Sequence, residues 1–159
     1  MRLAKTMRLD ISDTKIFSNP SKSGEWAITG TFSYVDVDYK SLNSKEKIQY
    51  KSGWLGLGSF GRSTLVYVTE INEIEHQQII RQLAEYIFSQ FGAPDMLEAL
   101  KAAHHEVNDM ATLCNHPTGT LLAIGRSVDG MKITEQVRKV QNSEGDNHVQ
   151  IWEIAKENK

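Results

Sequence analysis

The chain has 159 residues, of which 40% are hydrophobic and 24% charged, and its formal net charge is −2. This length and composition suit one soluble globular domain over residues 1–159, which would bury roughly 70% of the surface that the unfolded chain exposes. A net charge so close to zero disfavours nucleic acid or an anionic membrane as a partner, and a single cysteine excludes an internal disulfide.

The N-terminal segment meets charge at Lys5, Arg8 and Asp10 before any signal-type apolar segment can form. No later apolar run approaches the ~20 residues that a membrane-spanning helix needs. We therefore expect a cytoplasmic protein with no membrane partner.

The first third of the chain contains two predicted strands. Residues 3–11 alternate loosely between apolar and polar side chains, and residues 26–34, WAITGTFSY, alternate cleanly, as in a strand covered on one face. The polar stretch that follows can hold a short helix starting after Ser44. Asp36 and Asp38 in this stretch would share one side of an extended segment, and such a pair is usually a solvated edge.

The segment GLGSFGRS fits the pattern G-x-G-x-x-G at Gly56, Gly58 and Gly61. A dinucleotide site would need this pattern to open a helix, whereas the strand-like sequence STLVYVTEI follows it here. The residues of this segment resemble the glycine-rich loop of protein kinases. However, the sequence that follows contains no strand with the catalytic lysine, no catalytic loop and no D-F-G segment. We interpret the segment as a glycine-rich turn around which Trp54, Leu55 and Phe60 pack. Alternatively, its backbone amides beside Arg62 can cradle a phosphate or a carboxylate.

The three tryptophans lie far apart in the sequence. Trp26 and Trp152 fit the covered faces of predicted strands. Trp54 is flanked by glycines in a predicted loop, so we expect its side chain to be partly exposed and to anchor a partner.

Two helices are predicted in the middle of the chain. Apolar residues form one stripe at helical spacing over 72–91, where Asn72 suits the N-cap and Gly92 the position after the last turn. A second helix is predicted over 94–114, with Pro94 in its first turn and apolar residues spaced alternately four and three apart. The short connection between the helices predicts an antiparallel hairpin.

The lone cysteine lies near the end of the second helix, in LCNHPTGTLLAIGR. Cys114 shares an apolar seam with Val107 and Met110, where burial would raise the thiol pKa above its usual ~8.5 and leave it unreactive. Its only neighbour with metal-ligating chemistry is His116, and two ligands do not make a structural zinc site. We predict a packed cysteine followed by the helix-stopping Pro117, with no metal and no cofactor. A nucleophilic thiol beside His116 is the alternative.

Further strands are predicted at 63–71, 120–128 and 148–155. Strands before and after a helical pair are typical of an α+β two-layer sandwich. We therefore predict a mainly antiparallel sheet of about five strands, with an antiparallel helix pair, at about 72–91 and 94–114, packed on one face.

Several segments together resemble an uncharacterised bacterial family of small proteins, a domain of unknown function of about this length. They are MRLAKTMRLDISDTKIF, GEWAITGTF, GWLGL, FGRSTLV, FGAPD and LCNHPTGTLLAIGR. The similarity spans nearly the whole chain, and the last segment is the most specific. The resemblance implies a bacterial cytoplasmic protein, and it supplies no activity and no catalytic residues.

No nucleophile, acid–base pair or ligand set converges in the sequence. We therefore favour a non-enzymatic accessory or protein-binding subunit, with self-association as an open alternative. A second hypothesis is a small-molecule or anion-binding protein, or an enzyme, in which the loop 56–62 holds an anionic group beside Arg62, with His116 as an acid–base group. The candidate surface for either role comprises Trp54, Gly56, Gly58, Phe60, Gly61, Arg62, His116 and Pro117.

Overall fold

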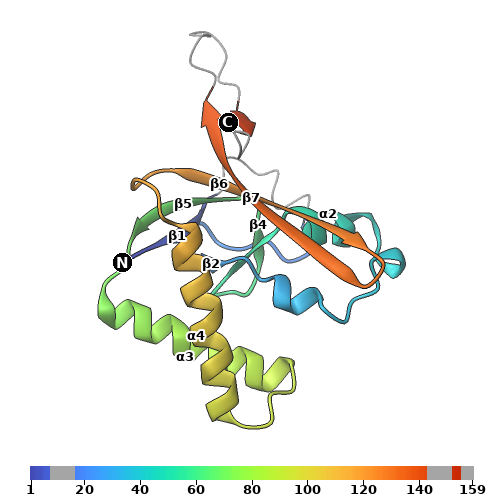
Figure 1. Cartoon of the computed structure of the whole chain (residues 1–159), viewed down its shortest axis with the longest axis horizontal. Helices are drawn as coiled ribbons and strands as arrows, with labels where there is room; N and C mark the ends of the chain where they lie inside the picture. The colour runs from blue at the N-terminus through green and yellow to red at the C-terminus, as the bar shows by residue number, and fades with distance from the viewer. Residues whose placement is uncertain (8–16, 143–151, 155–159) are drawn as a thin grey trace.

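The computed structural model describes residues 1–7, 17–142 and 152–154 (Figure 1). Within these ranges one antiparallel sheet of eight strands curls into a half-barrel. The strand order is β4-β3-β2-β1-β5-β6-β7-β8. The strands are β1 (Arg2–Met7), β2 (Trp26–Ile28), β3 (Trp54–Gly56), β4 (Arg62–Ser63), β5 (Leu65–Glu70), β6 (Leu121–Asp129), β7 (Lys132–Asn142) and β8 (Trp152–Ile154).

The described residues also form three α-helices and two short 3-10 helices, which are α2 (Ser44–Ser52), α3 (Glu73–Gln90), α4 (Met96–Leu113), η1 (Thr31–Tyr34) and η2 (Tyr39–Ser41). The caps of all three α-helices follow from local chemistry, because an Asn or Asp side chain accepts a hydrogen bond from the backbone three residues later. These caps are Asn43, Asn72 and Asp95. The two long helices therefore lie within a few residues of their predicted bounds, and the short helix expected after Ser44 is α2.

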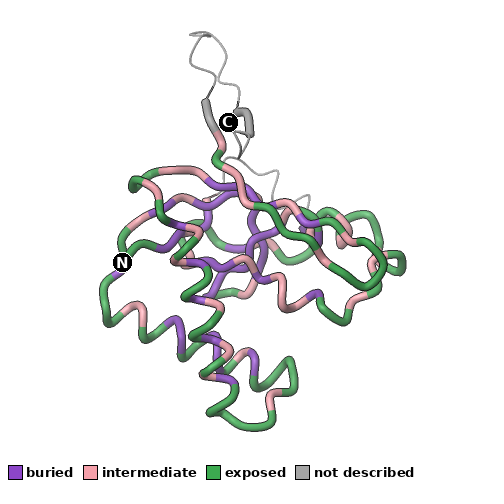
Figure 2. Tube along the Cα trace, in the orientation of Figure 1, coloured by how far each residue is buried: buried purple, intermediate pink, exposed green. Residues whose placement is uncertain are grey.

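The core lies between the central strands and the helix pair, and Figure 2 shows the buried stretches concentrated there. Strands β1 and β5 are buried on both faces: neighbouring residues such as Leu3 and Ala4 have no exposed surface. Helix α3 contributes Ile79, Ile80 and Leu83, and α4 contributes Ala103, Val107, Met110 and the C-cap Cys114. The apolar seam predicted for the second helix is thus the surface that α4 buries.

The predicted architecture of a two-layer sandwich with about five strands is wrong, although α+β remains the broad class. Strands β3 and β4 are three and two residues long, which is too short for a periodic pattern. Strand β7 is rich in charged residues, and it joins the sheet because it pairs with β6 along nine positions. Helices α3 and α4 contact each other and cross in the view of Figure 1, and a third helix, α2, packs on β6.

The predicted strand over 26–34 is also shorter than expected. It ends at Ile28, because Gly30 adopts a left-handed conformation with φ of 76° and directs the chain into η1. The later part of the predicted strand 3–11 and most of 148–155 lie outside the described residues. In the part of the chain that the structure describes, no helix combines the length and the apolar content needed to cross a membrane.

Candidate functional site

The glycine-rich loop between β3 and β4 does hold an anion, and that anion is the side chain of Glu25. Oε1 of Glu25 accepts hydrogen bonds from the backbone N–H groups of Gly58 and Ser59, at 2.8 and 2.6 Å. Oε2 accepts from the hydroxyl of Ser59 at 2.7 Å and from the backbone N–H of Lys22 at 2.5 Å. The loop amides therefore have an internal partner, and they are not available to an external phosphate while Glu25 occupies them.

The spacing of the three glycines follows from these close approaches. A Cβ at Gly56 would lie 2.8 Å from Oε1 of Glu25, and a Cβ at Gly58 would lie 3.0 Å from it. A Cβ at Gly61 would lie 2.6 Å from the carbonyl oxygen of Pro20, whose segment runs alongside β4. The G-x-G-x-x-G pattern thus serves internal packing of the backbone, as the interpretation as a turn requires.

Burial raises the pKa of Glu25, but the hydrogen bonds from Ser59, Lys22 and Gly58 outweigh it and hold the pKa below its ordinary value. The unfolded chain therefore takes up a proton first as the pH falls. The carboxylate stabilises the fold at neutral pH, and this contribution is lost as the pH falls through the folded-state pKa.

Replacing Glu25 with Gln is expected to lower the free energy of unfolding at pH 7 by about 1–2 kcal/mol, a value kept small because the carboxylate is partly exposed. Urea unfolding at pH 7 and pH 3 measures this: the wild type should lose more stability than Glu25→Gln over that interval. Glu85→Gln, at an exposed position on α3, is the control and should change stability by less than about 0.5 kcal/mol. Equal pH dependence of Glu25→Gln and wild type would contradict the role of the carboxylate.

Phe60, at the tip of the same loop, belongs to a row of aromatic side chains. Its ring stacks on Tyr86 of α3 with centroids 3.9 Å apart, Tyr86 meets Phe91 at 5.4 Å, and Phe91 meets Phe32 at 5.2 Å. Phe32, Phe60, Tyr86 and Phe91 are here called the aromatic cluster. Phe91 is 42% exposed, and the other three are half-buried.

Phe60 also has a φ of 57°, and among the described residues no other non-glycine residue has a positive φ. The left-handed conformation costs a residue with a Cβ about 1–2 kcal/mol. Such backbone strain is typical of functional sites, where the surrounding structure holds the residue in its conformation.

Arg62 does not serve as a counter-charge to the loop. Its side chain is buried, and it donates hydrogen bonds from Nη1 to the carbonyl of Gly53 at 3.3 Å and from Nη2 to Oγ of Ser33 at 2.6 Å. Burial lowers the pKa of Arg62. The glycine-rich loop and the arginine that follows it therefore belong to different environments.

A second buried arginine, Arg126 of β6, lies close to the first. Its Nε donates to Oγ1 of Thr31 at 2.7 Å, its Nη1 donates to the carbonyl of Tyr50 at 2.8 Å, and its Nη2 donates to the carbonyl of Thr29. Burial, and then the charge of Arg62, lower the pKa of Arg126 to about 10, so it remains charged at neutral pH.

Both guanidinium groups lie over the ring of Tyr34, with Cζ of Arg62 4.7 Å and Cζ of Arg126 5.2 Å from the ring centroid. Neither arginine forms an ion pair with a carboxylate among the described residues. Glu135 belongs to this network, because it accepts a hydrogen bond from the Thr31 hydroxyl that Arg126 contacts and its charge interacts favourably with Arg126. Two positive charges are thus held in a buried region without a direct carboxylate contact.

Trp54, predicted to be partly exposed, has no exposed surface. It lies in β3, paired with β2 and β4, and its indole N–H has no hydrogen-bond partner in the described chain. Its side chain is part of the core, so it offers no surface to a partner.

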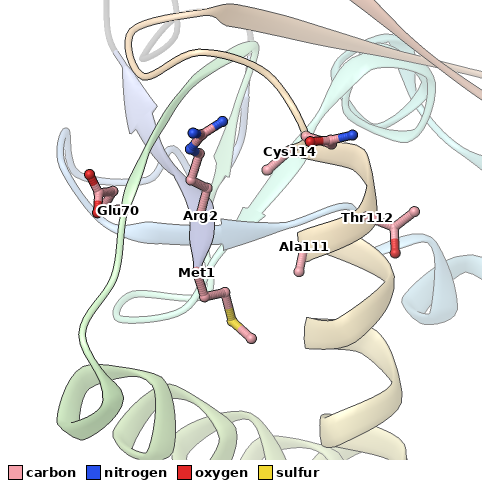
Figure 3. A pocket seen from close by; sticks show the side chains of 7 residues that line it. Met1, Arg2, Glu70, Ala111, Thr112 and Cys114 are labelled. Atoms are coloured by element: carbon pink, nitrogen blue, oxygen red, sulfur yellow. The ribbon is translucent and has the colours of Figure 1, made fainter.

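Cys114 caps the C-terminus of α4 and is buried, as predicted. It forms part of the wall of a cavity of about 750 Å³ (Figure 3), in which Met1, Arg2 and Glu70 lie opposite the end of α4. Burial raises the pKa of the thiol to about 12. In the described part of the chain, no group of three or more His, Cys, Asp and Glu residues is placed to hold a metal ion.

The thiol of Cys114 is accordingly expected to react very slowly with a disulfide reagent at pH 7.5, because almost none of it is thiolate and reagent access is blocked. Thiol titration with and without denaturant checks this. A Thr112→Cys variant, which adds a thiol at an exposed position on the same helix, should gain one rapidly reacting group. Rapid reaction of the native wild-type protein would contradict the buried assignment.

The corner after Cys114 lies apart from the glycine-rich loop. The carbonyl of His116 accepts a hydrogen bond from Arg2, and Pro117 is exposed in the turn before β6. This turn pairs with β5 through Gly119 and Thr120, whereas the loop lies between β3 and β4, and both β1 and β2 stand between β5 and β3. His116 and Pro117 therefore do not share a site with Gly56, Gly58, Phe60 and Gly61.

Sequence reasoning missed Glu25, Tyr34, Tyr50 and Arg126. Arg126 carried a weak signal, as a charged residue shortly after the apolar run 121–124. Glu25 carried none, because its partners Gly58 and Ser59 are more than thirty positions away in the chain.

No curated protein and no solved structure matches the chain. A sequence model described as a family of unknown function (DUF6505) matches residues 1–157. The resemblance to a family without an assigned activity is thereby confirmed over nearly the whole length, and the chain belongs to the DUF6505 family.

Proposed function

We propose that this protein is a non-enzymatic accessory protein that binds a partner protein through the aromatic cluster of Phe32, Phe60, Tyr86 and Phe91. The observation that carries the proposal is the exposed ring of Phe91 beside three half-buried aromatic rings in direct contact. Phenylalanine and tyrosine are enriched in the buried centres of protein interfaces, where they supply large apolar contact area.

The loop that carries Phe60 supports this assignment. Glu25 ties the loop to the chain before β2 through Gly58 and Ser59, and the ring of Phe60 is fixed by stacking on Tyr86. A side chain that is already ordered loses little conformational entropy when a partner binds. The loop thus presents Phe60 in a fixed orientation, at the cost of its left-handed backbone.

Two further features favour binding over catalysis. The glycine-rich amides are engaged by Glu25, and the one cysteine has a thiol pKa of about 12, far above the range of a nucleophile that works at neutral pH. The proposal also places the protein in the bacterial cytoplasm, where a free cysteine stays reduced.

The test uses benzoylphenylalanine, a photo-crosslinking amino acid, placed at Phe91 in the native cell. The expected result is a covalent adduct with one other protein. The same substitution at Lys132, an exposed position on β7, is the control and should give no such adduct. The purified partner should then bind Phe60→Ser and Phe91→Ser at least tenfold more weakly than the wild type, with melting curves that remain cooperative.

An adduct with a second copy of this chain alone would replace the proposal with self-association. Equal adducts from Phe91 and Lys132, or a partner that binds the two serine variants as tightly as the wild type, would overturn it.

A further inference from the structure

A second cavity lies between β2 and α3. Its volume is about 510 Å³, within the size range of pockets that bind ligands. It is lined by Trp26, Glu75, Gln78, Ile79, Arg81, Gln82 and Glu85. None of these residues belongs to the aromatic cluster, so the cavity adds a part of the surface that the proposed function does not use.

The cavity adjoins the aromatic cluster along α3. Gln82 lines the cavity one helical turn before Tyr86 of the cluster, so the two residues lie on the same side of the helix. On the opposite wall, the carbonyl of Trp26 accepts a hydrogen bond at 2.7 Å from the backbone N–H of Leu57, in the loop that carries Phe60. The cavity and the cluster therefore form one elongated surface beside α3.

The inner wall of the cavity is apolar and already ordered. Ile79 is 4% exposed, and Trp26 is half-buried. Nε1 of Trp26 donates a hydrogen bond to Oε2 of Glu75 at 3.4 Å, which holds the indole against α3. A wall that is ordered before binding loses little conformational entropy when an occupant packs on it. The cavity therefore suits one apolar side chain of a partner.

Two exposed side-chain amides, those of Gln78 and Gln82, also line the cavity. Neither amide forms a hydrogen bond within the part of the chain that the structure describes. Each carries donors and an acceptor, as a peptide group does. Residues four apart on a helix are about 6 Å apart along its axis, and alternate residues of an extended chain repeat at about 6.6 Å. The two amides are thus spaced to bind two peptide groups on one edge of an extended segment.

The charges around the cavity balance one another. Glu75, Arg81 and Glu85 line it, and Nζ of Lys5 lies 4.6 Å from the ring centroid of Trp26. Two acidic and two basic side chains create no strong potential of either sign. A partner segment without net charge matches this surface.

We propose that the partner binds through an extended segment without net charge, which runs along α3 from the aromatic cluster into this cavity. The inference rests on the proposed function and specifies the chemistry of the partner. The backbone of the segment forms hydrogen bonds with Gln78 and Gln82, and one apolar side chain packs on Trp26 and Ile79. A helical segment would satisfy its own backbone groups and leave both amides without partners.

The experiment places benzoylphenylalanine at Gln78, Phe91 or Gln77 of the full-length chain in the native cell and maps each crosslink on the partner by mass spectrometry. Gln78 and Phe91 are 13 positions apart, which corresponds to about 20 Å along α3. Their crosslinks should fall about six residues apart on one partner if the segment is extended, and about 13 residues apart if it is helical. Gln77, exposed on another side of α3, is the control and should give no adduct with that partner.

Variants then test the individual contacts. A synthetic peptide that covers both mapped positions should bind the purified wild-type protein with an affinity that added salt hardly changes. The double variant Gln78→Ala and Gln82→Ala should bind this peptide about tenfold more weakly, because two hydrogen bonds are lost. Gln77→Ala is the matched control and should bind as the wild type does. Trp26→Ala should weaken binding at least tenfold while its melting curve stays cooperative.

The results separate the extended segment from the aromatic cluster. An adduct from Phe91 with none from Gln78 would overturn the extended segment and leave the cluster as the docking surface. Absence of an adduct at both positions would overturn both. Crosslinks spaced as in a helix, a peptide that binds the double variant as tightly as the wild type, or an affinity that falls steeply with salt would overturn the extended, uncharged segment alone.

Discussion

Replacing Trp54 with alanine is expected to lower the free energy of unfolding by about 3–5 kcal/mol. The side chain has no exposed surface and lies in the core with Leu55 and Ile28. Its removal therefore leaves a cavity that the paired strands β2, β3 and β4 cannot close. Urea unfolding at equilibrium, followed by far-ultraviolet circular dichroism, measures the loss.

Two variants act as controls for this experiment. Trp54→Phe keeps most of the volume and removes the unpaired indole N–H, so it should cost much less than Trp54→Ala. Trp26→Ala removes a tryptophan that is only half-buried and should also cost less. A loss below about 0.5 kcal/mol for Trp54→Ala is what an exposed side chain would give. That result would contradict the burial of Trp54 and support the earlier prediction that its side chain is exposed and anchors a partner.

Replacing Gly30 with alanine is expected to lower the free energy of unfolding by about 2–5 kcal/mol, from two sources. The φ of 76° costs a residue with a Cβ about 1–2 kcal/mol. The new Cβ would also lie 2.6 Å from Nη1 of Arg62 and 2.6 Å from Cβ of Leu55, and overpacking of a core typically costs about 1–3 kcal/mol. The guanidinium cannot easily withdraw, because Gly53 and Ser33 accept its hydrogen bonds.

Gly24 provides the matched control, because it has a similar φ of 84° and a Cβ there would meet nothing within 4 Å. Gly24→Ala therefore carries the backbone cost alone, about 1–2 kcal/mol. The difference between the two variants in urea unfolding isolates the contact with Arg62 and Leu55. Equal losses at the two positions would show that the space around Gly30 is not limiting.

The helices and the cysteine were predictable because the information that decides them is local. Apolar spacing over 18 residues and a capping side chain specify α3 and α4 within the sequence itself. The phase of the second helix likewise placed Cys114 on the buried seam, where its pKa is raised. The glycine-rich segment could also be interpreted as a turn from local information, because the sequence directly after it does not predict a helix.

The sheet and the candidate sites were not predictable in the same way. Strands β3 and β4 form because β3 pairs with β2 and β4 pairs with β3. Both are too short to show an alternation of apolar and polar residues. Glycines around Trp54 indicated a loop, whereas Trp54 is buried in β3 and a Cβ at Gly53 or Gly56 would lie 2.8 Å from an oxygen of Gln49 or Glu25. Strand β7 forms despite its charged composition because β6 pairs with it over residues 132–140 and β8 pairs with its last residues, up to Asn142.

The sequence by itself determined the helices, their caps, the burial of Cys114 and the turn at the glycines, since each depends on residues within a few positions of one another. Only the tertiary structure brought Glu25 to the loop amides, and Arg62 and Arg126 to Tyr34. These contacts join residues between 28 and 92 positions apart. The curl of the sheet places them together, and no periodic pattern records a distance of that kind.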